Sequence, residues 1–189
     1  TVAETVLLSA KGAVLWKSDE AVGGYGNQFL GEKGTLALSS WAPDGATAFV
    51  VWPDGNVAEV PGVIPIGGPT AKGRFPALLT PDSYLQEYGW SAPGAEATPL
   101  EYGVYYGGAP VESGGVLYYL GLTDEESGSL ALVAESEAAT GALPLSADAA
   151  YLGNVAAPFA MVRDDYVWSS PQILANPLAG TAKSVAPPG

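Results

Sequence analysis

The stretch W-A-P-D-G-A-T-A-F-V-V-W-P-D-G-N-V-A-E-V-P-G, from Trp41 to Gly62, decides the fold class of this chain. Two turn sequences, Pro43-Asp44-Gly45 and Pro53-Asp54-Gly55, bracket one apolar run. In such turns proline presets φ, aspartate folds onto the backbone and glycine supplies a positive φ. The run between them, Ala46–Trp52, is β-branched and aromatic, as strands are. The stretch therefore predicts a β-hairpin in which both aspartates form turns rather than bind ligands.

Similar runs recur along the chain. Thr5–Ser9 and Ala13–Lys17 are predicted to form a first hairpin, and Tyr102–Tyr106 with Val116–Leu122 a second strong one. One short helix is predicted over Thr80–Gly89, because threonine is a good N-cap and proline suits the first helical position. About eight to ten short strands result, which predicts an all-β fold, a single antiparallel β-sandwich or jelly-roll barrel with one short helix.

We predict one β-sandwich (jelly-roll) domain over residues 1–169, followed by an extended C-terminal arm over residues 170–189. The arm contains four prolines and no periodicity, yet keeps apolar side chains that could lie on a neighbouring subunit. The proline-rich segment Pro61–Pro76 is predicted to be an edge or a crossover loop, because proline cannot donate to a strand ladder.

Composition excludes several classes of function. The chain has 189 residues without a cysteine or a histidine, which excludes disulfides, structural zinc, Cys nucleophiles and Ser-His-Asp catalysis. Acidic residues outnumber basic ones 20 to 7, for a net charge of −13, so the surface repels nucleic acid and anionic lipid. No apolar run approaches the ~18 residues of a membrane span. The acidic surface indicates either a halophilic protein or an ordinary acidic extracellular one. A thermophilic protein is the third option, because Asn, Gln, Met and Cys are scarce, although the chain lacks the Lys–Glu networks usual on thermophile surfaces.

Aromatic side chains are abundant, with five Trp and ten Tyr. Successive strand residues face opposite sides, so one tyrosine of each neighbouring pair, such as Tyr118 and Tyr119, is expected to face outward or into a partner. Such rings suit a subunit interface or a sugar-stacking platform, although most are expected to be core. Trp16, Trp41 and Trp52 are predicted to be core residues.

Two dense carboxylate clusters occur, Asp124/Glu125/Glu126 and Asp164/Asp165. Neither has the spaced ligand pattern of a calcium loop, so we interpret both as solvated turns, with a surface cation between subunits as the alternative. A glycosidase needs two carboxylates ~5–10 Å apart. Glu59, Glu101 and Glu112 are candidates on or near strands, but no spacing selects a pair.

The segment from Gly67 to Gly73 is glycine-rich, which is one feature of a phosphate-binding loop. It lacks the Gly-Lys-Ser/Thr ending and the apolar helix that follow in a P-loop, so we interpret it as an ordinary loop. We predict no catalytic, cofactor-binding or metal-binding residues.

A small, acidic, cysteine-free β protein with Pro/Gly-rich loops and an apolar terminal arm resembles the single-jelly-roll (vertical β-barrel) major capsid proteins of tailless, membrane-containing viruses of halophilic archaea and Thermus. The resemblance concerns the strand series Thr35–Val60 and Tyr102–Leu122 and the arm after Ser170. It implies upright barrels that pack edge to edge in a virion shell, without catalysis.

The leading hypothesis is therefore a structural virion protein that assembles with copies of itself or a sister subunit and is not an enzyme. A carbohydrate-binding β-sandwich, located outside the cell, is the alternative, and it requires coplanar exposed rings. An acidic glycoside hydrolase is the third hypothesis, and it requires a cleft with two facing carboxylates.

Overall fold

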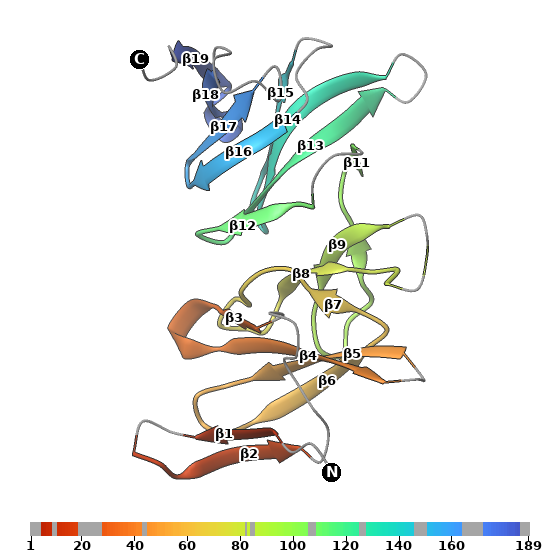
Figure 1. The fold of residues 1–189 in the computed structure, drawn as a ribbon, viewed down its shortest axis with the longest axis vertical. Helices are drawn as coiled ribbons and strands as arrows, with labels where there is room; N and C mark the ends of the chain where they lie inside the picture. The colour runs from red at the N-terminus through yellow and green to blue at the C-terminus, as the bar shows by residue number, and fades with distance from the viewer. Residues whose placement is uncertain are drawn as a thin grey trace. The chain divides into compact units, whose positions relative to one another are not determined.

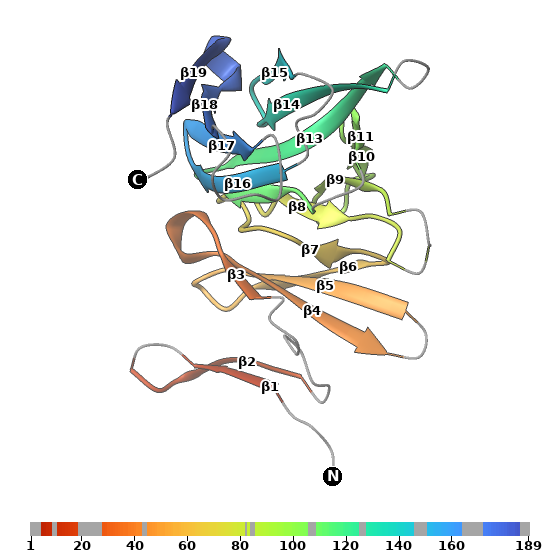
Figure 2. The same ribbon diagram turned by 45° about the horizontal axis from the view of Figure 1, so that its top comes forward.

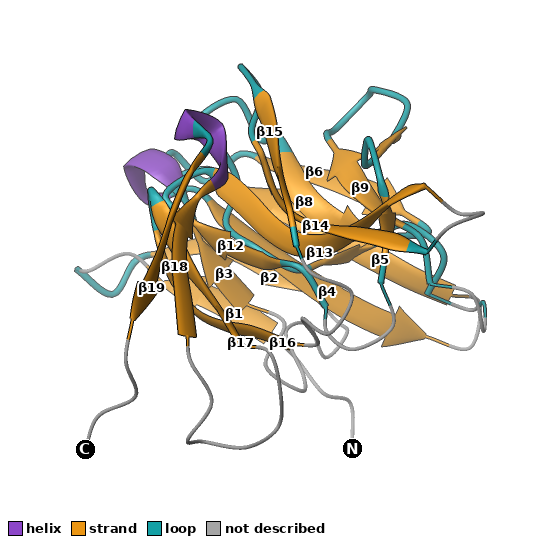
Figure 3. Ribbon diagram, turned by 90° about the horizontal axis from the view of Figure 1, so that it is seen from above, coloured by secondary structure: helices purple, strands orange, loops and turns teal. Residues whose placement is uncertain are grey.

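The computed structural model describes residues 5–8, 11–18, 28–42, 45–81, 83, 86–105, 109–124, 128–145, 151–163 and 172–185. They form strands joined by short connections, and helix is confined to two short 3-10 turns (Figure 3). The chain divides into two compact units, Thr1–Pro99 and Leu100–Gly189. The predicted all-β fold is confirmed, but the compact units divide the chain within the predicted 1–169 domain.

The first unit contains ten described strands and one 3-10 turn. They are β1 (Thr5–Leu8), β2 (Val14–Ser18), β3 (Gln28–Leu30), η2 (Glu32–Gly34), β4 (Leu36–Ala42), β5 (Gly45–Val51), β6 (Val57–Pro61), β7 (Ile64–Pro65), β8 (Phe75–Leu78), β9 (Tyr88–Ser91) and β10 (Thr98–Pro99). All pairs are antiparallel, in the orders β1-β2, β3-β4-β5-β6 and β10-β9-β8-β7.

The sheet β3-β4-β5-β6 is the middle layer of the first unit (Figures 1 and 2). One of its faces packs Ala48 and Val50 against Phe75 of β8. Its other face packs Phe49 and Val51 against the β1–β2 hairpin. The continuous apolar run of β5 follows from this, because a strand buried on both faces has no polar alternation.

The opening stretch forms the predicted strands. β5 pairs with β4 from Leu36↔Val51 to Ala42↔Gly45, and with β6 from Thr47↔Pro61 to Val51↔Val57. Asp54 forms a turn as predicted, since its carboxylate accepts the Asn56 backbone N–H at 3.0 Å. Gly55 adopts the expected positive φ of 88°. Pro43 and Asp44, the first turn, lie outside the described residues.

The predicted helix over Thr80–Gly89 is wrong for the described residues of this range, none of which is helical. Its last two residues belong to β9, which pairs with β8. The Thr80 hydroxyl accepts the backbone N–H of Glu87 at 2.8 Å instead of capping a helix. A segment long enough for only two helical turns is not stable as a helix by itself, even with good N-cap residues. Here the pairing of β8 with β9 on either side of the segment determines its structure instead.

The second unit contains nine described strands and one 3-10 turn. They are β11 (Gly103–Val104), β12 (Val111–Ser113), β13 (Val116–Asp124), β14 (Ser129–Glu135), β15 (Thr140–Pro144), β16 (Tyr151–Ala156), β17 (Phe159–Arg163), β18 (Gln172–Asn176), η3 (Pro177–Ala179) and β19 (Thr181–Val185). One sheet has the order β11-β13-β14-β15, with β12 also on β13, and the other has the order β16-β17-β18-β19.

The second unit is a β-sandwich, since one core joins its two sheets (Figure 1). Tyr118, Leu120 and Leu132 from the first sheet pack with Val162 and Ala175 from the second. The predicted pairing of Tyr102–Tyr106 with Val116–Leu122 is present, but two short strands, β11 and β12, share the same edge of β13. β11 pairs at Val104↔Gly121, and β12 closes the tight turn at Ser113↔Val116.

The predicted extended arm over residues 170–189 is wrong for its described part. Residues 172–185 form β18 and β19, and β18 is hydrogen-bonded to β17 from Ala160↔Ala175 to Arg163↔Gln172. The connection between them is a 3-10 turn in which Asn176 accepts the Ala179 backbone N–H and Gly180 closes at φ 64°. Pro177 and Gly180, which lie in the described part, therefore form the turn of a hairpin.

Candidate interaction surface

The β1–β2 hairpin carries apolar side chains on both of its faces. Leu7 and Trp16, which are directly paired across the hairpin, face the middle sheet, and the Trp16 and Phe49 rings lie 5.5 Å apart. Leu8 and Val14 also form a cross-strand pair, yet they are 54% and 62% exposed. A two-stranded layer that is apolar on both faces has the pattern of an inner layer whose outer cover is missing.

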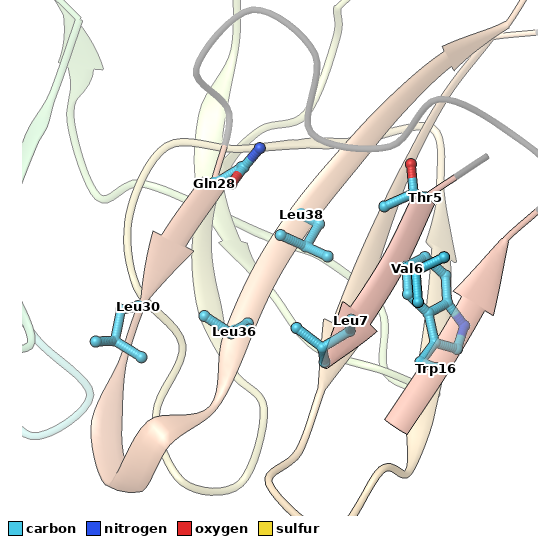
Figure 4. Close-up of a pocket in the computed structure, with 8 residues that line it drawn as sticks. All are labelled: Thr5, Val6, Leu7, Trp16, Gln28, Leu30, Leu36 and Leu38. Atoms are coloured by element: carbon cyan, nitrogen blue, oxygen red, sulfur yellow. The ribbon is translucent and has the colours of Figure 1, made fainter. Parts of the chain in front are cut away.

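An apolar groove runs between this hairpin and the neighbouring sheet. It has a volume of about 400 Å³, and Figure 4 shows Leu36 and Leu38 of β4 between the hairpin residues and β3. The lining residues are Thr5, Val6, Leu7, Trp16, Gln28, Leu30, Leu36 and Leu38. At the rim, Leu30 is 71% exposed. Only Thr5 and Gln28 bring polar side chains, so the groove suits apolar contact rather than recognition of a charged ligand.

A second hollow of about 290 Å³ lies on the same hairpin and continues this apolar surface. Its lining includes Leu7, Leu8 and Leu15 from the hairpin and Trp52 and Pro53 from the β5–β6 turn. Leu7 and Leu36 line both hollows. The exposed hairpin face, the groove and this hollow form one region, which we call the hairpin surface.

The second unit contains a buried polar pair at a different place. The Tyr119 hydroxyl donates to Glu135 Oε2 at 3.0 Å, and the Glu101 backbone N–H donates to the same oxygen at 3.2 Å. Both side chains are buried. Burial, and next the charge of Glu135, raises the pKa of Tyr119 well above its usual range. The tyrosine therefore acts as a fixed hydrogen-bond donor to a buried carboxylate.

Tyr118 faces the sandwich core on the opposite side of β13 from Tyr119. Its side chain is fully buried, and its hydroxyl has no hydrogen-bond partner among the described residues. Burial raises the pKa of Tyr118 as well. The prediction that one tyrosine of the pair faces outward is wrong, because both faces of β13 are covered along this strand.

The other predicted aromatic residues lie in varied places. Trp16 and Trp52 are half-buried against the two cores of the first unit, and the Trp52 Nε1–H donates to the Ala71 carbonyl at 3.2 Å. Trp41 was predicted to be core, but it is 60% exposed. Tyr102 and Tyr105 are half-buried, and Tyr106 lies outside the described residues. In the described chain, no unit presents two strongly exposed rings on one face.

The structure places the three glycosidase candidates at three different points of the fold. Glu59 is exposed on β6 of the first unit. Glu101 is exposed in the second unit, and Glu112 Oε1 accepts the Gly115 backbone N–H at 2.8 Å, which closes the β12–β13 turn. Glu112 therefore has a structural role in this turn, which explains its place without a catalytic function.

The acidic clusters are only partly described. Asp124 is exposed at the end of β13, whereas Glu125/Glu126 and Asp164/Asp165 lie outside the described residues. Among the residues that the structure describes, no group of three carboxylate, His or Cys side chains could hold a metal ion. The described part also has no helix long and apolar enough to cross a membrane.

The glycine-rich segment Gly67–Gly73 connects β7 to β8 as the predicted loop. Its Thr70 N–H donates to the Arg74 carbonyl at 2.7 Å, and its Gly73 N–H donates to the Thr70 carbonyl at 2.9 Å. The Ala71 N–H donates to Glu32 Oε2 at 3.0 Å. These donors therefore serve the protein itself, and one of them already binds an internal carboxylate.

Sequence reasoning missed the hairpin surface and the buried Glu135. The signal for the first was present, since Thr5–Leu8 reads T-V-L-L without polar alternation. For Glu135 no signal existed, because its strand neighbours give no hint of its partner Tyr119, 16 residues away. A scan against protein-family models and a search of curated proteins found no match.

Proposed function

We propose that the protein is a structural, non-catalytic subunit that assembles with copies of itself or with a sister subunit, in the manner of a virion shell protein. The observation that carries the proposal is the β1–β2 hairpin, which packs Leu7 and Trp16 inward and exposes Leu8 and Val14. Burial of such a side chain stabilises a contact by about 1.5–3 kcal/mol. Two of them beside an apolar groove favour association with another β surface.

Two further features support assembly over the alternatives. The sequence lacks cysteine and histidine, and the candidate carboxylates Glu101 and Glu112 hold backbone groups or lie in solvent. A sugar platform needs coplanar exposed rings, whereas the strongly exposed described rings, Trp41 and Phe159, belong to different units. The glycosidase and carbohydrate-binding hypotheses therefore have no specific observation in their favour.

The test is sedimentation velocity of the full chain over a concentration series and an NaCl series. We expect a species heavier than the 19.2 kDa monomer, favoured at high salt, where the charge of −13 is screened. The double variant Leu8→Ser/Val14→Ser is expected to weaken association at least tenfold. Val111→Ser, at a 41% exposed site on β12, is the control and should associate as the wild type does.

A sister subunit is tested separately, by mixing the chain with the other proteins of the particle or complex from which it is purified. A wild-type chain that stays monomeric at every salt concentration and binds none of them contradicts the proposal. Equal association of the double variant and Val111→Ser contradicts the role of the hairpin surface.

A further inference from the structure

The sheet β16-β17-β18-β19 has an unusual charge for this chain. Its described strands and turns, residues 151–163 and 172–185, contain no Asp or Glu. They contain Arg163 and Lys183, which are the two basic residues of the second unit. In a protein with 20 acidic residues and a net charge of −13, the described strands of this sheet are basic, and Asp164 and Asp165, which follow Arg163 in the sequence, lie outside the described residues.

Both basic residues lie on the same face of the sheet. Cross-strand pairing aligns Met161 with Leu174 and Lys183, and Arg163 with Gln172 and Val185. The alternate residues, such as Ala160, Val162 and Ala175, belong to the sandwich core. Since side chains alternate along a strand, the first set points away from that core. We call this outer side the β16–β19 outer face.

The β16–β19 outer face combines apolar area with positive charge. Phe159 is 45% exposed, Met161 and Leu174 are half-buried, and every residue of β19 is exposed, Lys183 included. Gly153 lies next to the Arg163 side chain, because a Cβ added at Gly153 would meet Arg163 Nε at 3.8 Å and Met161 Cβ at 3.7 Å. The missing side chain leaves room for the guanidinium stem to lie flat on the sheet.

We propose that the β16–β19 outer face docks an acidic surface of a second copy of this chain. Charge complementarity supports this contact, since the described part of this face is basic while exposed carboxylates such as Glu101 and Glu137 lie elsewhere in the same unit. Self-pairing of the face would oppose like charges, which costs free energy. The contact is therefore head-to-tail, between two different surfaces of the chain. This inference rests on the proposed function and adds a second contact to the hairpin surface.

The test is a charge-reversal pair measured by sedimentation velocity at the lowest salt concentration at which the wild type associates, because added salt also screens the attraction between Lys183 and carboxylates. Lys183→Glu is expected to weaken association at least tenfold. Lys72→Glu changes the net charge equally at an exposed position of the first unit, and it should match the wild type within about threefold. A second variant, Phe159→Ser, is expected to weaken association, whereas Val111→Ser is expected not to. Urea unfolding of each variant confirms that it is folded.

Each outcome has a distinct meaning. If the wild type associates and Lys183→Glu and Lys72→Glu weaken it equally, this face is not the contact, although the proposed function stands. If the wild type is monomeric at every salt concentration, the second-copy contact is overturned. Binding of wild type, but not of Lys183→Glu, to phosphatidylcholine vesicles that contain phosphatidylserine would assign the face to an anionic membrane and also overturn the inference.

Discussion

Glu135 is the only carboxylate side chain buried in the described part of the chain. A buried charge is costly unless hydrogen bonds replace its hydration. Here Tyr119 and the backbone N–H of Glu101 both donate to one of its oxygens. The pair links β13 to β14 and to the segment before β11, so it fixes how the first strands of the second unit meet.

The first prediction concerns this hydrogen bond. Tyr119→Phe removes a donor from a buried carboxylate, and we expect the free energy of unfolding to fall by about 2 kcal/mol. The measurement is urea unfolding at neutral pH. Tyr88→Phe is the control, because its hydroxyl bonds to Gln86 at an exposed site and should cost less than about 0.5 kcal/mol. Equal losses in the two variants would show that the buried pair contributes nothing special.

The second prediction concerns pH. Burial and the Glu135 charge raise the pKa of Tyr119 above its ordinary value of 10.0, so the unfolded chain loses this proton first as pH rises. The contribution of Tyr119 to the free energy of unfolding is therefore fully present below about pH 10. Above that pH it falls by about 1.4 kcal/mol per pH unit. The free energy of unfolding of Tyr119→Phe should therefore fall less steeply with rising pH than that of the wild type, by that amount. Parallel curves for wild type and variant between about pH 9 and about pH 11 would contradict this.

Sequence reasoning succeeds for residues whose role is local and fails where the partner is remote. Asp54 forms the predicted turn because its hydrogen bond reaches only two residues along the chain. Tyr119 is buried because β14 and Glu135 meet it, which its own neighbours in sequence do not reveal. The prediction that Trp41 is a core residue is wrong. Trp41 lies near the end of β4, where the side chain is 60% exposed although the residue type is apolar.

Among the elements, the 3-10 turn η2 and the Gly67–Gly73 loop are joined by two hydrogen bonds. The Glu32 N–H donates to the Pro69 carbonyl at 2.8 Å, and its carboxylate accepts from Ala71 at 3.0 Å. Gly68 makes the close approach possible, because a Cβ there would meet the Leu30 carbonyl oxygen at 2.7 Å. This contact joins the middle sheet of the first unit to the sheet that covers it.

The third prediction tests this contact. Glu32→Ala removes the acceptor of the Ala71 N–H, and we expect the free energy of unfolding to fall by about 1 kcal/mol. Glu32→Gln keeps an acceptor oxygen and should recover about half of the loss. Glu96→Ala, at an exposed loop position, is the control and should change stability by less than about 0.5 kcal/mol. The idea fails if Glu32→Ala and Glu96→Ala unfold at the same urea concentration.

Strands are predicted well from this sequence, whereas the connections between them are not. Ala46–Trp52 and Val116–Leu122 are apolar runs between glycine-containing turns, and both form strands. Thr80–Gly89 carries helix-start residues, but β8 and β9 pair across it. Among the described residues after Ser170, Pro177 lies in the 3-10 turn between β18 and β19, where it is compatible with the hairpin, so proline count alone misled.

In the whole chain, charge and architecture act together. Acidic residues exceed basic ones by 13, and each unit must fold against the resulting repulsion. The predicted all-β class is correct because it depends on apolar runs between turns, which are local, although the structure describes 19 strands where about eight to ten were predicted. The division at Pro99 was not predicted, although a segment rich in proline and alanine, S-A-P-G-A-E-A-T-P over residues 91–99, ends at this boundary.

The fourth prediction follows from the net charge. Raising NaCl from about 0.01 M to about 1 M shortens the screening length from ~30 Å to ~3 Å, so the free energy of unfolding should rise. Urea unfolding measures this, since urea adds no ions of its own. A free energy of unfolding that stays flat or declines over this range would show that repulsion between the carboxylates does not limit stability.

The central claim is that apolar strand surfaces of this chain exist to contact another subunit. The most direct measurement is the molar mass of the wild-type chain by light scattering, as protein concentration rises at about 1 M NaCl, where repulsion is screened. We predict a mass that climbs above the 19.2 kDa of the single chain. A mass that stays at 19.2 kDa at every concentration, alone and with the proteins with which the chain is purified, would contradict the account.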